Sequence, residues 1–285
     1  MSHSVIVAGA TGAIGRELIV ELVADASYKR IVALSRSSIP EGQWADKFPG
    51  VDVEKAKGRL EVVGIEWEGL AAHYKQEAGK LPKSQLVPLK DDWEAGFPYK
   101  AAFSGHTFAA MCMGTTRADA GGAEPFIRCD LDYVKGFHLA VREFSPDLKK
   151  CSQVSSDGAN SGSCFLYLRT KGLGDDALIG AGYTATSLFR PGLLRRKEKA
   201  RTMEKIITFF GAGMPVEDVA TAIVADFNGL SSSPQVTSQA TQNNGRVFSN
   251  GSIAALKQIV VEQRKAEQAK AAPVADSEVN KEEQK

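Results

Sequence analysis

Short apolar runs alternate with longer stretches of helical period along most of this chain. The apolar runs predict buried strands, and the amphipathic stretches between them predict helices. Strands are expected at residues 5–8, 31–34, 108–113, 151–154 and 186–189, and helices at 16–24, at 132–144, from near 165 onward and at 216–228. Because strands and helices alternate, the sequence predicts an α/β fold: a doubly wound parallel sheet with helices on both faces.

Two regions depart from this alternation. Residues 40–99 are rich in Lys, Glu and Gly and contain two competing strand candidates, 60–65 and 85–89. We interpret this region as holding an insertion, and the pattern does not decide which candidate joins the sheet. The polar run 231–245 is expected to be a loop.

The end of the chain has a different composition. Residues 263–285 are mostly Lys, Glu, Gln and Ala and lack the apolar surface that would offset the entropy of ordering. The sequence therefore predicts one domain over 1–262, followed by a disordered charged tail over 263–285.

Three glycines follow the first predicted strand and precede the first predicted helix. Gly9 permits a tight turn, Gly12 lets the backbone approach a pyrophosphate, and Gly15 lets the helix pack against the strand. The free N–H groups of a helix N-terminus attract phosphate, and here they follow Thr11 at Ala13 and Ile14. A plain glycine-rich turn is the alternative, but the order strand, glycine turn, helix favours an NAD(P)-binding domain of Rossmann type.

The end of the second predicted strand indicates which dinucleotide is bound. NAD sites carry an acidic residue there to hold the ribose 2′-hydroxyl, whereas this chain has Arg36 and Ser37. A guanidinium can make bidentate, charge-assisted contacts to a 2′-phosphate, so NADP(H) is the expected cofactor. An ordinary surface arginine is the alternative.

Tyr167 and Lys171 lie four residues apart on a predicted helix, which places them on one face. An ammonium beside a phenol lowers the pKa of the phenol and lets it exchange a proton with a carbonyl oxygen or an alcohol. Two serines end the preceding strand; Ser156 is the preferred hydroxyl to bind the substrate oxygen, and Ser155 is the alternative. Tyr167, Lys171 and Ser156 are thus the expected catalytic residues.

Composition and charge narrow the function further. Lys and Arg number 35 and Asp and Glu 34, for a net charge of +1, and the basic run 195–199 is short and of mixed charge, so no nucleic-acid partner is expected. No secretion signal or membrane-spanning run is recognised, so we expect a cytoplasmic protein, with the surface of the mitochondrial outer membrane as the alternative. The four cysteines and four histidines show no metal-ligand spacing, so no metal is expected.

Four further stretches make the sequence resemble a known family. They are 105–106 leading to 113–117, then 130–134, then 155–159 with 165–167, and 189–194. With the glycine turn and the Tyr-Lys pair, they resemble the atypical short-chain dehydrogenase/reductases, and more narrowly the Tat-interacting protein oxidoreductase-like family, over about residues 4–228. The resemblance implies cofactor contacts from Thr11, Arg36, Ser37, Met113, Gly114, Tyr167 and Lys171, with Leu194 on the nicotinamide side and Arg201 closing on the cofactor.

Together these features predict an NADPH-dependent oxidoreductase that reduces a carbonyl of a small-molecule substrate. Hydride transfer would be coupled to proton donation by Tyr167. The alternative is a regulatory or scaffolding protein that binds NADPH and a protein partner and turns over little.

Overall fold

The computed structural model describes residues 2–77, 97–195, 213–241 and 245–271. In these ranges the main sheet has eight strands: β1 (His3–Ala8), β2 (Tyr28–Ser35), β3 (Leu60–Gly64), β4 (Phe108–Met111), β5 (Lys150–Val154), β6 (Thr186–Phe189), β9 (Gln239–Ala240) and β10 (Gly245–Phe248). A second, two-stranded sheet pairs β7 (Leu194–Arg195) with β8 (Met214–Pro215). The longer helices are α1 (Ala13–Ala24), α4 (Trp67–Glu77), α9 (Tyr133–Phe144), α10 (Leu166–Gly180), α12 (Val216–Phe227) and α13 (Asn250–Ala271).

Short helical elements join them. These are η1 (Glu41–Gln43), α2 (Trp44–Lys47), α3 (Val53–Ala56), α6 (Lys100–Phe103), α7 (Arg117–Ala120), α8 (Ala123–Ile127), η4 (Leu230–Ser232) and a π-helical turn, η3 (Arg128–Asp132). The π turn runs directly from α8 into α9.

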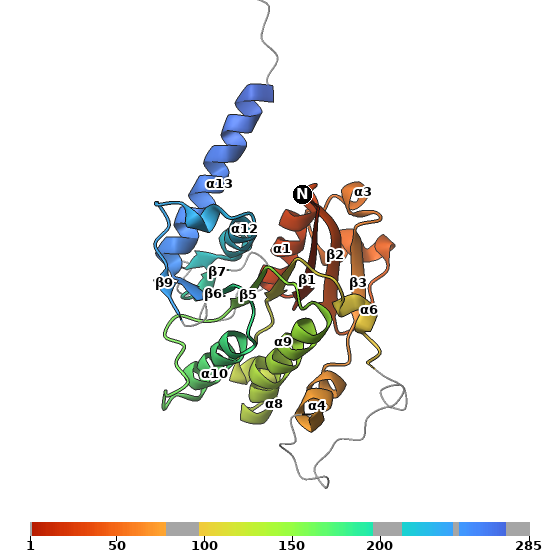
Figure 1. Ribbon diagram of the computed structural model, residues 1–285, viewed down its shortest axis with the longest axis vertical. Helices are drawn as coiled ribbons and strands as arrows, with labels where there is room; N and C mark the ends of the chain where they lie inside the picture. The colour runs from red at the N-terminus through yellow and green to blue at the C-terminus, as the bar shows by residue number, and fades with distance from the viewer. Residues whose placement is uncertain (1, 78–96, 196–212, 242–244, 272–285) are drawn as a thin grey trace, which may run out of the picture.

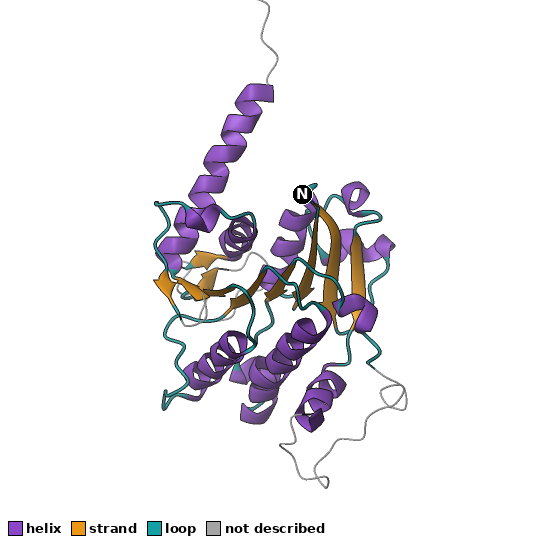
Figure 2. Cartoon of the chain, in the orientation of Figure 1, coloured by secondary structure: helices purple, strands orange, loops and turns teal. Residues whose placement is uncertain are grey.

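The strand order in the main sheet is β3-β2-β1-β4-β5-β6-β10-β9, and every pair is parallel except β10 with β9. Helices α1, α12 and α13 lie on one face, and α4, α9 and α10 lie on the other (Figure 1; Figure 2). Each face has its own buried hydrophobic cluster. The expected α/β fold with a doubly wound sheet is therefore confirmed.

The central strand shows why the pattern predicts a parallel sheet. Val5, Ile6, Val7 and Ala8 are each 0% exposed, because helices cover both faces of β1. A strand that is buried on both faces needs a continuous apolar run instead of an alternating one.

The order in which strands are added to the sheet changes direction after β3. From β1 the chain builds outward to β2 and β3, then returns to add β4 on the other side of β1. Ala8 is in register with Leu34 of β2 and with Met111 of β4, so the carboxyl ends of all three strands meet at one edge. Ligands of open α/β sheets bind at such a switch point.

The described parts of the region 40–99 contribute to the sheet and to both core clusters. β3 pairs with β2, which decides the competition in favour of the first strand candidate; the second, 85–89, lies outside the described residues. Trp44 and Phe48 are buried in one core cluster, and Trp67 at the start of α4 is buried in the other. The mixed composition concealed these contacts because a few large aromatic side chains, spaced irregularly, make them.

The region after α12 also differs from the expectation. The predicted loop 231–245 contains the buried Val236 and the short strand β9, and it leads into β10, which the sequence analysis missed. Helix α13 extends to Ala271, so residues 263–271 are helical where a disordered tail was predicted. Ala, Glu, Gln and Lys are strong helix formers and can prolong a helix whose first turns are anchored by buried Ile253 and Leu256. The remaining residues, 272–285, lie outside the described part of the chain.

Candidate active site

The glycine turn between β1 and α1 forms a close-packed backbone cradle. Gly9 has φ +71°, and a Cβ atom there would lie 2.6 Å from the backbone nitrogen of Met113. A Cβ on Gly15 would lie 2.1 Å from the carbonyl oxygen of Gly9. Any side chain at either position would therefore displace the backbone of the turn or of the β4 loop.

The N-terminus of α1 opens onto this cradle. Its N-cap residue, Gly12, has no side chain to satisfy the first N–H groups of the helix, which begins at Ala13. The uncapped N–H groups and the positive end of the helix dipole suit a phosphate. The turn fits a dinucleotide pyrophosphate on the strength of its own geometry.

A pocket of about 110 Å³ lies beside this turn and brings distant segments together. It is lined by Gly12, Ala13, Ile14, Cys112, Met113, Gly114, Thr115, Val154, Ser155, Tyr167, Lys171 and Leu194. Eight of the residues expected at the site line it: Gly12, Ala13, Ile14, Met113, Gly114, Tyr167, Lys171 and Leu194. The glycine turn and the Tyr-Lys pair, more than a hundred residues apart in the chain, thus share one cavity.

Of the two candidate serines, Ser155 lines the pocket and Ser156 does not. Ser155 is 7% exposed. Ser156 is half-buried, and its hydroxyl donates to the carbonyl oxygen of Asp157 at 3.3 Å. The geometry therefore favours Ser155, the alternative, over Ser156.

The remaining expected cofactor residues lie around or outside the pocket. Gly9 and Gly15 do not line the pocket but allow the close backbone packing of the turn. Thr11 is exposed on the turn. Arg36 and Ser37 are exposed at the carboxyl end of β2, next to the turn. Arg201 lies outside the described residues.

Tyr167 is 39% exposed, and its ring stacks on Phe126 of α8 at a centroid distance of 5.7 Å. Lys171, one turn further along α10, is 8% exposed. Burial lowers the pKa of the Lys171 ammonium, but the charge and hydrogen bond of Asp130, together with the charges of Tyr167 and Asp175, outweigh it, so that the pKa lies above its ordinary value. Lys171 is therefore a cation at neutral pH.

Two glycines let α10 approach its neighbours closely enough to place Lys171. A Cβ on Gly172 would lie 2.1 Å from the backbone nitrogen of Ser161, and one on Gly174 would lie 3.3 Å from the carbonyl oxygen of Asp130. The helix consequently packs against the backbone of the π turn η3. The role of these glycines is not predictable from the sequence, because a glycine within a helix does not reveal what it approaches.

A buried polar network lies behind the site. Arg190, at the end of β6, donates to Asp175 of α10 at 2.8 Å, and Gln153 donates to the same carboxylate at 3.0 Å. Gln153 also contacts Nε2 of His138 at 2.8 Å. Burial raises the pKa of Asp175, and the nearby Ser155 hydroxyl and the Arg190 guanidinium oppose that rise. Arg190 belongs to a stretch that carried the family resemblance, and this contact gives it a structural role.

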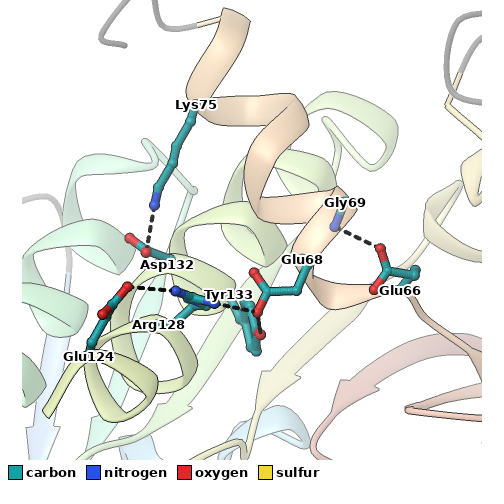
Figure 3. A network of polar contacts seen from close by, with 8 residues as sticks. All are labelled: Glu66, Glu68, Gly69, Lys75, Glu124, Arg128, Asp132 and Tyr133. Atoms are coloured by element: carbon teal, nitrogen blue, oxygen red, sulfur yellow. Dashed lines mark hydrogen bonds and ion pairs between the residues drawn. The ribbon is translucent and has the colours of Figure 1, made fainter. Parts of the chain in front are cut away.

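A second polar network holds the π turn to α4 on its outer side (Figure 3). Glu68 accepts hydrogen bonds from Arg128 at 3.1 Å and from the Tyr133 hydroxyl at 2.6 Å. Lys75 pairs with Asp132 at 2.6 Å. These contacts anchor η3 and the start of α9 to α4.

Two negative findings apply to the described residues only. No group of three or more His, Cys, Asp or Glu side chains there is placed to hold a metal ion. No helix in that part of the chain has the length and apolar character needed to cross a bilayer.

The fold and the shared pocket together give a Rossmann-type α/β protein with a glycine turn and a Tyr-Lys pair, an arrangement that resembles the short-chain dehydrogenase/reductases. No family model matches the chain. It is 35% identical over 144 residues to protein HTATIP2 of Rattus norvegicus, covering 50% of this chain and 56% of that protein. It is 29% identical over 196 residues to the mitochondrial protein FMP52 of Candida albicans, covering 69% of each. The chain thus resembles the atypical short-chain dehydrogenase/reductases of the HTATIP2 type, as its sequence motifs predicted.

Solved structures show the same fold at low sequence identity. A UDP-glucuronic acid 4-epimerase from Bacillus cereus in complex with NAD matches with TM-score 0.54 and 11% identity, over 86% of this chain and 76% of that one. The reductase domain of a nonribosomal peptide synthetase from Mycobacterium tuberculosis matches with TM-score 0.55 and 16% identity, over 93% of this chain and 72% of that one. At these identities the likeness establishes the fold alone.

Proposed function

We propose that the protein is an NADP(H)-dependent oxidoreductase that reduces a carbonyl group of a small-molecule substrate. The observation that carries this proposal is the shared pocket, which the glycine turn and the Tyr167-Lys171 pair both line. The match to HTATIP2 spans only 56% of that protein, so activity and substrate are proposed from the site itself.

The chain offers the groups that NADP(H) requires. The glycine turn and the N-terminus of α1 would hold the pyrophosphate, and Gly114 would let the β4 loop lie close to the ribose. Arg36 is exposed at the end of β2 and takes part in no ion pair within the described segments, so its guanidinium is free to hold a 2′-phosphate with Ser37. Leu194 would lie against the nicotinamide. Arg201 would close on the cofactor, as the family resemblance implies.

The protein's own residues would supply the proton and stabilise the charge that its transfer leaves behind. Bound NADPH provides the hydride. Tyr167 would donate the proton from its hydroxyl to the substrate oxygen, and the Lys171 ammonium would stabilise the phenolate that remains. A serine hydroxyl, from Ser155 or Ser156, would hydrogen-bond the substrate oxygen and hold it next to the Tyr167 hydroxyl.

The first experiment is a titration with NADPH and NADH, followed by turnover with a panel of aldehydes and ketones. Tyr167→Phe should abolish turnover, because it removes the transferable proton, while NADPH affinity stays within about threefold. Unchanged turnover would overturn the mechanism. Tight NADPH binding by the wild type without turnover of any compound would favour the NADPH-binding regulatory protein instead.

The two serines can be separated by a matched pair of variants. Ser155→Ala should lower kcat by about 100-fold or more if its hydroxyl orients the substrate, since it removes an interaction that strengthens in the transition state. Ser156→Ala should then change kcat by less than about threefold. The reverse ranking would restore Ser156 to the catalytic position.

A mitochondrial location is proposed in place of the cytoplasm. The FMP52 relatives carry the word mitochondrial in their names, which fits the outer-membrane alternative better than a cytoplasmic protein. Cell fractionation followed by protease treatment of intact mitochondria would test it. Recovery of the protein in the cytosolic fraction alone would exclude it.

A further inference from the structure

Asp130 lies at the centre of the π turn η3 and is 1% exposed. Single π turns within helices are uncommon and occur often at functional sites. This one interrupts the path from α8 to α9 at the level of the reaction centre.

Each oxygen of this carboxylate contacts a different side of the pocket. Oδ1 lies 3.0 Å from the Nζ atom of Lys171 on α10. Oδ2 accepts a hydrogen bond of 2.9 Å from the backbone N–H of Thr115, in the loop that follows β4. One buried side chain therefore joins the lysine to the loop expected to contact the cofactor ribose.

The backbone of Gly114 packs closely against this ion pair. A Cβ on Gly114 would lie 3.1 Å from Nζ of Lys171 and 3.3 Å from Oδ1 of Asp130. The pair is thus sealed under the backbone of the β4 loop. A buried ammonium in such surroundings needs a counter-charge to remain a cation.

The π turn η3 carries a second aspartate, Asp132, which lies on the side away from Lys171. Asp132 pairs with Lys75 on the outer side of η3, facing α4, where the lysine is 42% exposed (Figure 3). The two aspartates are two residues apart on the same turn. Asp132 is a matched control for any effect of merely removing a carboxylate from η3.

We propose that Asp130 is a positioning residue for the reaction centre: it holds the Lys171 ammonium against the β4 loop, where the lysine reaches both the cofactor ribose and Tyr167. The proposal rests on the proposed function for its catalytic consequence. The ion pair itself can be tested without turnover.

The first test is a double-mutant cycle on stability. Asp130→Asn and Lys171→Met each leave a buried charge without its partner, so each should lower the thermal unfolding midpoint by about 10 °C. The double variant buries neither charge and should unfold at a higher temperature than the sum of the single losses predicts. Additive losses would show that the pair is not formed. If either single variant does not fold while the double variant does, that result supports the pair equally.

The second test follows NADPH affinity between pH 6 and pH 10, read by cofactor fluorescence. Because the pKa of Lys171 lies above its ordinary value of 10.5, the wild-type affinity should stay level across this range. Without Asp130, Lys171 should lose its proton more readily, so the affinity of Asp130→Asn should fall before pH 10. Asp132→Asn should behave as the wild type does. An affinity of Asp130→Asn that stays level to pH 10 would overturn the positioning role.

The two tests distinguish a failure of the Asp130 positioning role from a failure of the proposed NADPH-dependent function. If the wild type does not bind NADPH at any pH, the proposed function fails, while the stability cycle still decides whether Asp130 and Lys171 form a pair. If the wild type binds NADPH and the cycle is additive, only the inference fails.

Discussion

At the scale of single residues, glycines control how closely the backbone segments of the site approach one another. The sequence predicted Gly9, Gly12 and Gly15 because a strand, a turn and a helix follow one another locally. It could not predict that Gly174 faces Asp130, or that Asp130 reaches Lys171, because these contacts join residues about forty positions apart. Pairings of this kind follow from how helices pack, which local pattern does not determine.

Gly9→Ala should remove cofactor binding and destabilise the fold. The added Cβ would approach the backbone of Met113 to 2.6 Å at φ +71°, so both a clash and a strained backbone result. We expect a loss of at least about 3 kcal/mol in the free energy of unfolding, measured by urea denaturation, and no detectable NADPH binding.

Gly50→Ala is the control for that substitution. Gly50 has φ +89° but open space around its Cβ position, so only the backbone strain applies. Its cost should be about 1 kcal/mol, with NADPH affinity unchanged. Equal costs for the two variants would show that close packing at the glycine turn does not matter.

Arg36→Asp should reverse the preference between the two dinucleotides. An acidic residue at the end of β2 repels a 2′-phosphate and can accept a hydrogen bond from a 2′-hydroxyl. NADPH affinity should fall by about 100-fold and NADH affinity should stay level or rise, as measured by fluorescence titration. An unchanged ratio of the two affinities would mean that Arg36 is an ordinary surface arginine.

At the scale of whole elements, strongly periodic segments were predicted well and short or composite ones were not. The five predicted strands and the helices α1, α9, α10 and α12 are present near their expected positions. β10 was missed because four residues, one of them Arg246, give too little pattern, and the π turn was missed because it has no period of its own. Helix α13 was not predicted, and its last turns were assigned to a disordered tail because they depend on helix propensity and not on burial.

Truncation after Glu262 tests how α13 is held. Residues 262–270 are exposed, and the Arg264–Glu21 ion pair links this part of the helix to α1. A partly exposed pair contributes about 1 kcal/mol at most, so the shortened chain should unfold within about 4 °C of the full chain in a thermal melt.

A longer truncation provides the comparison. Ending the chain at Ser249 also removes Ile253 and Leu256, which are both 0% exposed. Losing two buried aliphatic side chains should cost about 5 kcal/mol or more and leave a chain that melts far lower or does not fold. Similar melting of both truncated chains would show that α13 contributes nothing to the core.

At the scale of the whole molecule, buried histidines make stability depend on pH. Burial lowers the pKa of His106 and of His138 to about 4 in the folded protein. Between pH 6.5 and pH 4 the unfolded chain therefore binds protons that the folded one excludes. The folded state should lose up to about 1.4 kcal/mol per histidine for each pH unit below 6.5.

Urea denaturation at pH 7.5, 6.0 and 5.0 measures this loss. The raised pKa of Asp175 acts in the opposite direction at the acidic end, since the folded state there holds a proton that the unfolded chain releases. Stability should therefore fall more steeply between pH 6.0 and pH 5.0 than between pH 7.5 and pH 6.0. His106→Asn should reduce that slope by about half, and an unchanged slope would assign the pH dependence to other groups.

The position of β1 in the middle of the sheet bears on how the protein is made. As the chain leaves the ribosome, β1, β2 and β3 are completed first, and one edge of β1 then has no neighbour until Phe108–Met111 of β4 has been synthesised. At about 5 to 20 residues per second, that edge stays unpaired for seconds. An apolar strand with an open edge is a site where nascent chains can associate, so a chaperone that covers β1 during synthesis should raise the yield of folded protein more than one supplied after release.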